Sequence, residues 1–417
     1  MEVYMERKEK ALLVGVSLYN QDILRSMDEL SNLARACNIE VVGTITQNLN
    51  RINVSHYIGT GKVSEVHELV RERSVEIVVF DDELSPTQIR NLEDALGCRV
   101  LDRTVLILDI FAKRAKTKEA KLQVEIARLN YNLPRLVGQN ESLGRQSGGV
   151  GTYNKGSGEK KLELDRRGIK QRINKLSKEL ALLVSRRKNQ RKQRQKNEIP
   201  VVSLVGYTNA GKSTVMNALL NLYNPTTKTV YEEDMLFATL ETSVRNIKLP
   251  GNKSFLLTDT VGFISKLPHH LIKAFRSTLE EVKESDLLIH VVDLSNPDHM
   301  EQVLVTENTL KELGIEDIPV IYVYNKIDLV DNFSESEGVH ISAKNKIGID
   351  ILIEEIEKRV LRNYTHCKML IPYNNGDTLS YLLDNANILS TSYEDDGTLI
   401  ALECKESDYH KYKRYIM

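Results

Sequence analysis

The pattern of apolar residues divides the chain into regions of different secondary structure. Short apolar runs predict strands at 11–18, 39–47, 75–80 and 98–101. The stretches between them, 21–37, 62–73 and 86–96, have the three- and four-residue apolar spacing of amphipathic helices. Strands that alternate with helices are typical of a small α/β domain with a mostly parallel sheet, which we predict over residues 1–103.

From Thr104 onward the pattern becomes helical. A narrow apolar stripe runs through Leu122, Ile126, Leu129 and Leu133, and a second runs through Ile169, Ile173, Leu176, Leu180 and Leu183. Two such stripes predict a pair of long helices packed antiparallel, as a coiled-coil arm over residues 104–197. The segment 143–158 between them holds six of the chain's 22 glycines, so we expect a mobile loop there.

Strands and helices alternate again over 198–364, with apolar runs beginning at Val201, Phe255, Leu287, Val320 and Gly338. This pattern predicts a second α/β domain. The last part, 365–417, has apolar pieces around 367–372 and 398–404, and we expect a small α+β domain there.

Composition limits the class of protein. Hydrophobic residues make up 41% of the 417 residues and charged residues 28%, which fits a globular chain. No apolar run approaches the roughly 18 residues of a membrane span, and the N-terminus lacks the apolar core of a secretory signal. We therefore expect a cytoplasmic protein with no membrane span. The four cysteines form no C-x-x-C pair, which argues against a zinc site, and we expect buried free thiols.

Charge is distributed unevenly along the chain. The 57 Lys and Arg residues nearly cancel the 58 Asp and Glu residues, and the formal net charge of −1 at first argues against a nucleic-acid binder. Residues 155–196, however, hold 16 basic and four acidic side chains, a local charge of +12. A helical arm with this charge predicts contact with nucleic acid, whereas an ordinary solvated helix mixes both signs.

The strongest motif follows the apolar run 201–205. Gly206, Gly211, Lys212 and Ser213 satisfy the pattern G-x-x-x-x-G-K-[ST] between a predicted strand and a predicted helix. In such a loop the backbone N–H groups surround a nucleotide phosphate, and the helix that follows points its positive end at it. The lysine bridges the β- and γ-phosphates, and the serine hydroxyl is a ligand of Mg²⁺. The predicted phosphate-binding residues are Gly206, Tyr207, Thr208, Asn209, Ala210, Gly211, Lys212, Ser213 and Thr214.

Two further segments predict contacts to the metal and the γ-phosphate. Asp259-Thr260-Val261-Gly262 ends an apolar run, where the carboxylate can hold the metal through water and the Gly262 N–H can contact the γ-phosphate. The candidate for a closing segment is Phe237-Ala238-Thr239-Leu240-Glu241, in which Thr239 supplies a second hydroxyl. We thus predict Ser213, Thr239 and Asp259 as metal ligands and Lys212, Thr239 and Gly262 as catalytic residues.

Two more segments predict the base. In Asn325-Lys326-Ile327-Asp328 the Asp328 carboxylate can accept from both N1–H and N2–H₂ of guanine, donors that adenine does not present. Ser342-Ala343-Lys344 follows the next predicted strand and can direct a backbone N–H at guanine O6. These segments, in this order, predict an enzyme that binds GTP and GDP and hydrolyses GTP.

One expected group is missing. Ras-like enzymes orient the attacking water with a glutamine directly after the D-x-x-G glycine, and Phe263 occupies that position. Intrinsic hydrolysis should therefore be slow, or the missing group must come from a partner or a bound cation. Our hypothesis is a K⁺ ion held by Asn209, beside Mg²⁺ as the main cofactor.

Taken together, these motifs resemble those of the HflX family of translational GTPases. The resemblance rests on the phosphate loop, on 237–241 and on 259–282, and in the first half on 57–63, 81–93, 102–115 and 158–167; it covers roughly 10–365. It implies a GTP-controlled factor that binds the 50S subunit and splits stalled or idle 70S ribosomes. Its N-terminal domain and arm would contact 23S rRNA near the peptidyl-transferase region. The resemblance also supports Thr239 as a metal ligand.

The chain departs from the family around Tyr153 and Asn154 in the glycine-rich segment, so the tip of the arm can touch RNA differently. We expect a monomer. The alternative function is a GTPase of large-subunit biogenesis or RNA modification, but an RNA-modifying enzyme needs a second catalytic constellation, and Cys37 and Cys98 lack an activating neighbour. Asn325–Asp328 argues against a metabolic kinase. Gly59-Thr60-Gly61-Lys62 resembles a phosphate loop only faintly, and we predict a structural turn there.

Overall fold

The structure is a computed structural model. It describes residues 8–19, 23–136, 155–196, 199–225, 236–237, 242–268, 271, 281–331, 337–361 and 364–417, and within the long helix it describes side chains only from 163 to 186. The chain divides into two compact units. The first comprises Met1–Asn189, Glu233–Glu241 and Ile264–Ser277, and the second comprises Gln190–Glu232, Thr242–Phe263 and Thr278–Met417.

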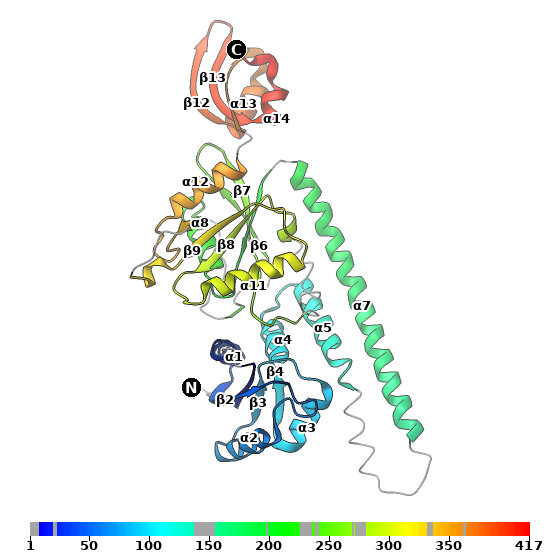
Figure 1. Ribbon diagram of the computed structural model, residues 1–417. Coiled ribbons are helices and arrows are strands. Elements are labelled where there is room, and N and C mark those ends of the chain that lie inside the picture. Colours follow the sequence, from blue (N-terminus) through cyan, green and yellow to red (C-terminus); the bar gives the residue numbers. More distant parts are fainter. Residues whose placement is uncertain are drawn as a thin grey trace, which may run out of the picture. The chain divides into compact units, whose positions relative to one another are not determined.

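The first unit contains a four-stranded parallel sheet in the order β2-β1-β3-β4 (Figure 1). Its strands are β1 (Lys10–Leu18), β2 (Glu40–Leu49), β3 (Ile77–Phe80) and β4 (Arg99–Asp102). The helices α2 (Thr60–Glu72) and α3 (Pro86–Leu96) share one hydrophobic core with the sheet. The helices α1 (Leu24–Ala36) and α4 (Arg103–Arg114) pack against each other. The predicted parallel α/β domain is confirmed.

Local signals explain where individual helices begin. Ser85 and Gln88 form a reciprocal capping box at the start of α3, and Gly97 ends that helix in the left-handed region. Gly59 precedes α2, and Thr60–Lys62 form its first turn. The segment Gly59–Lys62, for which we predict a structural turn, is thus the start of a helix. The Gly59 N–H that precedes the helix donates to the Gln47 side chain at 2.9 Å.

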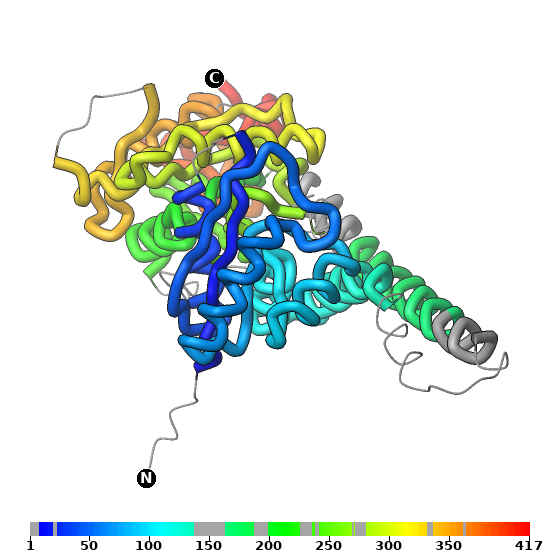
Figure 2. The backbone as a smooth tube through the Cα atoms, turned by 60° about the horizontal axis from the view of Figure 1, so that its bottom comes forward, coloured from blue at the N-terminus to red at the C-terminus, as the bar shows by residue number. Residues whose placement is uncertain are grey.

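Two helices form the predicted arm. They are α5 (Lys118–Asn132) and α7 (Lys155–Lys196), and they run side by side in Figures 1 and 2. Ion pairs join Lys118 to Glu179 and Glu125 to Arg172. A later residue of α5 thus pairs with an earlier residue of α7, so the two helices are antiparallel. The apolar stripe from Ile169 to Leu183 is partly buried, whereas the basic side chains beside it are exposed.

The loop prediction for 143–158 is partly wrong. Helix α7 already begins at Lys155, so 155–158 are helical, and 143–154 lie outside the described residues. The residues from Glu159 onward favour a helix, and this helix continues toward the N-terminus as far as Lys155. The glycines there do not prevent it, since each glycine in a helix costs only about 1 kcal/mol of stability. Gly168 lies within α7, and a Cβ added there would meet nothing within 4 Å.

The second unit contains a six-stranded sheet in the order β10-β9-β8-β5-β7-β6, in which only β6 is antiparallel to its neighbour. The strands are β5 (Val201–Val205), β6 (Ser243–Lys248), β7 (Ser254–Asp259), β8 (Leu287–Asp293), β9 (Val320–Asn325) and β10 (Val339–His340). Helices α8 (Lys212–Tyr223) and α12 (Ile349–Val360) share a core on one face, and α11 (His299–Glu312) packs with a second cluster on the other. This three-layer order is the α/β P-loop fold that the sequence predicts.

The same unit ends in a small C-terminal domain, Tyr364–Met417. Its antiparallel sheet, in the order β11-β13-β12, consists of β11 (Tyr364–Ile371), β12 (Asn387–Glu394) and β13 (Gly397–Lys405). Helices α13 (Gly376–Asn385) and α14 (Glu406–Lys411) complete the domain, and its own apolar core includes Met369, Leu382 and Leu402. The predicted small α+β domain is confirmed.

Candidate functional site

The phosphate-loop motif lies between β5 and α8, as its spacing predicts. Gly211 directly precedes α8 with a φ of +94°, and Lys212 is the first residue of the helix. The Lys212 ammonium donates to the carbonyl oxygens of Gly206 at 3.0 Å and Tyr207 at 2.7 Å. The loop thus folds around the lysine, with the helix N-terminus beside it.

Burial changes the acid–base behaviour of this lysine. Lys212 is only 6% exposed, and burial lowers the pKa of its ammonium to about 8, although the charge of Asp259 opposes this effect. His290 on β8 is also buried, and burial together with the charge of Lys212 lowers the pKa of its imidazole to about 4. At neutral pH the lysine is therefore charged and the histidine neutral.

Two of the three predicted metal ligands are described, and they lie together. The Ser213 hydroxyl donates to the carboxylate of Asp259 at 2.6 Å, and Asp259 is fully buried at the end of β7. A hydroxyl and a carboxylate are the hard oxygen donors that Mg²⁺ prefers, so this pair fits the ion. Among the described residues no cluster of three His, Cys, Asp or Glu side chains forms a separate metal site.

The residues after Asp259 explain the missing glutamine. Gly262 lies so close to the phosphate loop that a Cβ there would come within 2.6 Å of Thr208 Cα and 2.9 Å of Lys212 Nζ. Phe263 exchanges backbone bonds with the loop, through Thr208 N–H at 2.7 Å and Gly206 O at 3.1 Å. Its ring is buried in the core beneath α11, with Leu288 and Leu310. Phe263 thus anchors the segment and cannot orient water.

The predicted base-binding segments are joined by one amide. Asn325 donates from Nδ2 to Ala210 O at 3.0 Å and accepts at Oδ1 from Ala343 N–H at 3.0 Å. It therefore ties the phosphate loop to the segment Ser342–Lys344. Lys326 pairs with Asp293 at 2.7 Å, and Asp328 is exposed. The structure brings together all the predicted base and phosphate segments of the second unit.

The predicted closing segment is described only at its start. Phe237 is 1% exposed with a φ of +55°, and its ring makes an edge contact with Phe111 of α4, 4.7 Å between centroids. Ala238, Thr239, Leu240 and Glu241 lie outside the described residues. The contact with α4 was not predictable from the motif.

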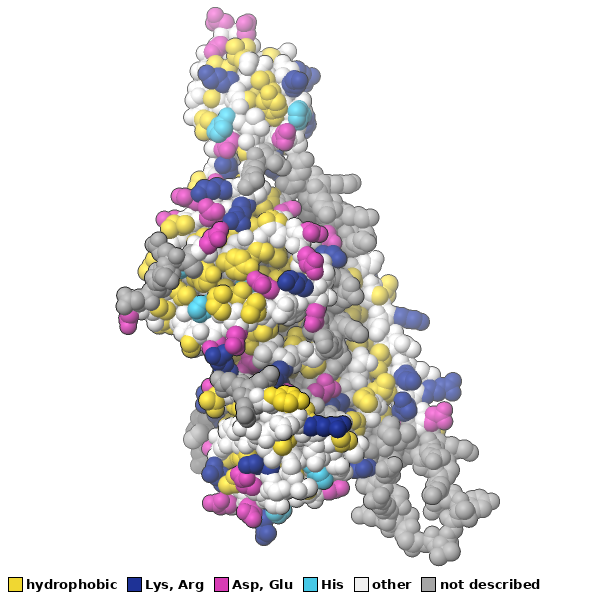
Figure 3. Space-filling model, in the orientation of Figure 1, with side chains coloured by type: hydrophobic (Ala, Val, Ile, Leu, Met, Phe, Trp, Pro, Cys, Tyr) yellow, Lys and Arg dark blue, Asp and Glu magenta, His cyan; other side chains and the backbone are white. Residues whose placement is uncertain are grey.

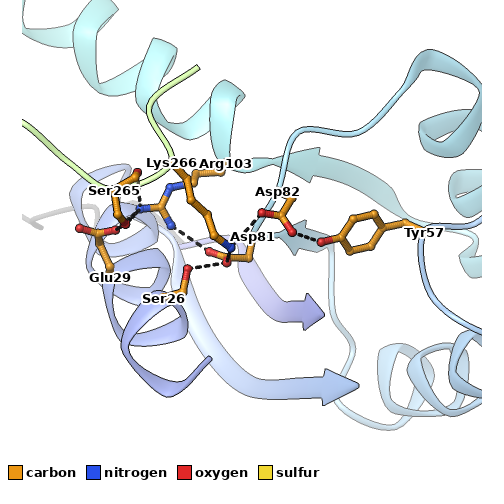
Figure 4. A network of polar contacts seen from close by, with 8 residues as sticks. All are labelled: Ser26, Glu29, Tyr57, Asp81, Asp82, Arg103, Ser265 and Lys266. Atoms are coloured by element: carbon orange, nitrogen blue, oxygen red, sulfur yellow. Dashed lines mark hydrogen bonds and ion pairs between the residues drawn. The ribbon is translucent and has the colours of Figure 1, made fainter. Parts of the chain in front are cut away.

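A polar network lies at the carboxyl ends of β3 and β4, and the sequence motifs do not predict it (Figure 4). The buried Arg103 guanidinium pairs with Asp81 at 2.8 Å and with Glu29, and it donates to the Ser265 carbonyl at 3.1 Å. Lys266 pairs with Asp81, which also accepts from Ser26 at 2.5 Å. Because Glu29 also accepts from the Ser265 hydroxyl, Glu29, Asp81 and Arg103 all hold the segment that follows Phe263.

Further contacts extend this network. Lys266 lies 2.8 Å from Asp82, which accepts a bond from the Tyr57 hydroxyl. Burial alone would lower the pKa of Lys266, but the two carboxylates outweigh it and raise that pKa, so the ammonium stays charged. The sequence signal was charged residues directly after two apolar strands, because the carboxyl ends of neighbouring parallel strands meet at one sheet edge.

The basic arm presents its charge to solvent. In Figure 3 dark-blue side chains stand out along the described part of α7, where Arg166, Arg167, Lys170 and Arg172 are exposed. The remaining basic residues of 155–162 and 187–196 lie where side chains are not described.

The four cysteines are free, and none is an activated nucleophile. Burial raises the pKa of the Cys37 and Cys404 thiols to about 12, and it also raises those of Cys98 and Cys367. Cys367 and Cys404 lie on paired strands with 3.9 Å between their sulfur atoms, a proximity that their sequence spacing does not indicate. In the described part of the chain no helix is both long and apolar enough to cross a bilayer.

Comparison with known proteins gives three family matches along the chain. Residues 24–112 match the profile described as GTP-binding GTPase N-terminal, and residues 114–194 match GTP-binding GTPase Middle Region. Residues 201–326 match 50S ribosome-binding GTPase.

Individual relatives are similar in sequence to this chain over nearly its whole length. GTPase HflX of Caldanaerobacter subterraneus is 47% identical over 405 residues, covering 97% of this chain and 92% of that protein. GTPase HflX of Escherichia coli K12 is 36% identical over 400 residues, covering 94% and 92%. Among solved structures, a GTP-binding protein from Sulfolobus solfataricus in complex with GDP is 26% identical, covering 85% of this chain and 99% of that one, with a TM-score of 0.43.

Proposed function

The chain belongs to the HflX family of GTPases, and from this premise we propose that it is a GTP-controlled factor that binds the 50S ribosomal subunit and splits stalled or idle 70S ribosomes. It binds and hydrolyses GTP. The observation that carries the ribosomal proposal is the match of residues 201–326 to a 50S ribosome-binding GTPase, joined to a helix with a charge of +12 over 155–196.

We propose these roles for the domains. Residues 1–103 form a nucleotide-independent RNA-docking domain, one that binds no nucleotide of its own. Residues 104–197 form the basic arm that reaches 23S rRNA, 198–364 bind GTP, and 365–417 form the small C-terminal domain. The protein acts as a monomer in the cytoplasm. The uneven charge supports this division, because −13 of the formal charge lies outside 155–196.

In the proposed site the chain's own groups divide the work on GTP. Backbone N–H groups of Asn209–Thr214 and the N-terminus of α8 hold the phosphates, and Lys212 bridges the β- and γ-phosphates. Ser213, Asp259 and Thr239 would hold Mg²⁺, which neutralises charge that develops on the phosphate oxygens. Asp328 accepts from guanine, and a backbone N–H of Ser342–Lys344, a segment that Asn325 holds through the Ala343 N–H, donates to guanine O6.

The step that responds to GTP is proposed at Gly262. When its N–H bonds to the γ-phosphate, the chain around it shifts, and Ser265 and Lys266 follow only three and four residues later. Those two residues bond to Arg103, Asp81 and Asp82 of the first unit. A change of nucleotide therefore reaches the RNA-docking domain through this segment.

Hydrolysis needs a group that Phe263 does not supply. We propose that a K⁺ ion held by Asn209 contributes it. Support comes from the exposed position of Asn209 in the phosphate loop, since a side-chain amide oxygen is a suitable ligand for a hard cation. Turnover should be several-fold faster in KCl than in NaCl at equal ionic strength; equal turnover in the two salts contradicts the proposal.

Sedimentation of purified 70S ribosomes tests the main proposal. With the protein and a non-hydrolysable GTP analogue, the 70S peak should fall and the 50S and 30S peaks should rise; with GDP the profile should stay unchanged. If 70S particles survive under every nucleotide, splitting is excluded. Binding to free 50S without splitting would favour the alternative role in large-subunit biogenesis.

A further inference from the structure

A β-hairpin connects Asp259 with the C-terminal domain. In the ladder of β6 and β7, Ser243 lies opposite Asp259 at one end, and Lys248 lies opposite Ser254 at the other. Within the described residues β6 is an edge strand that pairs only with β7. β7 also pairs in parallel with β5, where Leu204 lies opposite Asp259, whereas β6 has β7 as its one strand partner among the described residues.

The turn is shaped to meet the C-terminal domain. The Leu249 N–H donates to Lys253 O at 2.8 Å, and Gly251 and Asn252 both have positive φ, +75° and +58°. A Cβ on Gly251 would come within 2.5 Å of the side-chain amide carbon of Asn387, the first residue of β12. Only glycine allows this approach with this backbone conformation.

Asn252 satisfies the end of a helix in that domain. Its Nδ2 donates to Ala386 O at 2.9 Å and to Leu383 O at 3.3 Å. These carbonyls belong to the last turn of α13 and the residue that follows it, where a helix leaves acceptors without internal partners. The hairpin thus supplies the C-terminal cap of α13.

Lys253 forms the charged part of the contact. Its ammonium lies 3.0 Å from the Glu403 carboxylate on β13 and 3.7 Å from that of Glu357 on α12, and its side chain is only 16% exposed. Asn387 donates to the same Glu403 at 3.2 Å. Burial alone would raise the pKa of Glu403, but the bonds from Lys253 and Asn387 lower it, so the carboxylate stays ionised.

We propose that the C-terminal domain is a positioning element for the GTPase site: by holding Gly251–Lys253 it fixes the register of the β6–β7 hairpin and, through β7, the position of Asp259. Lys253 is then a positioning residue for the metal-bound nucleotide. This inference rests on the proposed role of Asp259 at Mg²⁺ and is independent of ribosome binding.

The physical basis is that a hydrogen-bonded strand pair does not stretch. Asp259 lies five positions after Ser254, about 17 Å along the strand, so a displacement of the turn along the strands is transmitted to the far end. β7 is held by β5 on its other side, whereas the outer edge of β6 pairs with no described strand. The contacts of Gly251–Lys253 with the C-terminal domain, which we call the clasp, add a second constraint on the hairpin at its turn.

The experiment measures the Mg²⁺ concentration that half-saturates binding of a fluorescent GTP analogue to the full chain, without ribosomes. Lys253→Met should raise this concentration about fivefold while leaving Mg²⁺-free GDP affinity within about twofold. The separate variant Lys253→Arg should require the same Mg²⁺ concentration as the wild type, because it keeps the positive charge between the two carboxylates. Lys358→Met, which removes an exposed partner of Glu355 at 2.9 Å on α12, is the matched control and should change nothing.

Hydrogen exchange of β12 and α13 establishes whether the clasp has opened in Lys253→Met. If it has opened and the Mg²⁺ requirement is unchanged, the proposal is overturned. Should Lys253→Met fail to fold, Glu403→Gln and Asn252→Ala each remove one contact and should shift the Mg²⁺ requirement in the same direction, and no shift in either overturns the proposal. Asp259→Asn tests the premise separately, since it should abolish the Mg²⁺ effect even with the clasp intact.

Discussion

At the scale of single residues, Lys212 shows how burial prepares a group for its ligand. The ammonium is enclosed by its own loop, where two carbonyl oxygens only partly replace the water it has lost. Its pKa is 10.5 in an unfolded chain and about 8 in the folded one. Between these values the unfolded chain binds more protons, so this group makes the nucleotide-free protein more stable as pH rises from 8 to 10.5.

The same pKa predicts proton uptake on nucleotide binding. Phosphate oxygens favour the charged ammonium, so at pH 9 binding of GDP should take up more than about half a proton, and less at pH 7.5. Titration calorimetry in buffers of different ionisation enthalpy measures this number. Identical heats in all buffers at pH 9 would show that Lys212 is already fully protonated in the free protein.

Asp328 carries a prediction about the base. Asp328→Asn replaces one of the two carboxylate acceptor oxygens with an NH₂ donor, so the side chain no longer matches the two donors of guanine. The affinity for GTP should fall by about 10- to 100-fold, and xanthosine triphosphate, which presents an oxygen instead of the 2-amino group, should bind better than to the wild type. Competition binding of both nucleotides checks this. Asp331→Asn, an exposed change three residues away, is the control and should leave the preference for guanine intact.

Arg103 carries a prediction about stability. Arg103→Ala leaves Asp81 and Glu29 facing each other without their shared cation, and we expect a loss of about 3–5 kcal/mol in the free energy of unfolding of the first unit. Arg99→Ala, four residues earlier on β4, removes only an exposed pair with Glu9 and should cost less than about 1 kcal/mol. Urea unfolding, followed by hydrogen exchange in α4, measures the stability of both variants. Equal losses of stability in Arg103→Ala and Arg99→Ala would contradict the stabilising role of Arg103.

At the scale of elements, the arm shows what an apolar stripe can and cannot predict. The stripes through Leu122 and Ile169 predict two helices and their antiparallel packing. The register, set by Lys118 with Glu179 and Glu125 with Arg172, was not predictable, because either stripe could slide by a heptad and still bury its leucines.

The charge of α7 predicts a salt-dependent affinity. Replacing Arg186, Arg187, Lys188, Arg191 and Lys192 by glutamine should weaken 50S binding, and each lost phosphate contact should reduce the slope of log affinity against log salt by about 0.9. GTP turnover without ribosomes should hardly change. Pelleting with 50S subunits over a range of KCl concentrations measures the slope. The same number of changes in the C-terminal domain, at Lys368, Lys405, Lys411, Lys413 and Arg414, controls for net charge.

At the scale of the whole molecule, neither unit is one continuous stretch of sequence, because two short segments of the first unit lie within the sequence of the second. Phe237, Ser265 and Lys266 are near in sequence to the nucleotide residues, yet they belong to the first unit. Motifs predict the nucleotide residues because one chemistry demands one spacing. They do not predict the contacts of Ser265 and Lys266 with Arg103 and Asp81, or the Gly251–Lys253 clasp, because these contacts join residues more than a hundred positions apart that share no pattern.

This arrangement predicts a long-range response to nucleotide. Exchanging GDP for a GTP analogue with Mg²⁺ should change hydrogen exchange in α1 and α4, which carry Glu29 and Arg103, although neither helix contains a predicted nucleotide residue. Mass spectrometry of peptides from 24–36 and 103–114 measures this response. Peptides from α2, on the other face of the sheet, serve as the internal reference, and a response confined to the second unit would exclude this route.

Gly168 gives the arm a mechanical property. The register of the two ion pairs places the end of α5, at Asn132, opposite about residue 165 of α7, so Gly168 lies close to the point where the shorter helix stops supporting the longer one. Helix α7 is about 63 Å long, and glycine is its least rigid kind of residue. We therefore expect the arm to be stiff along the length that α5 supports and to bend most readily near Gly168, so that its basic outer end can follow an uneven surface.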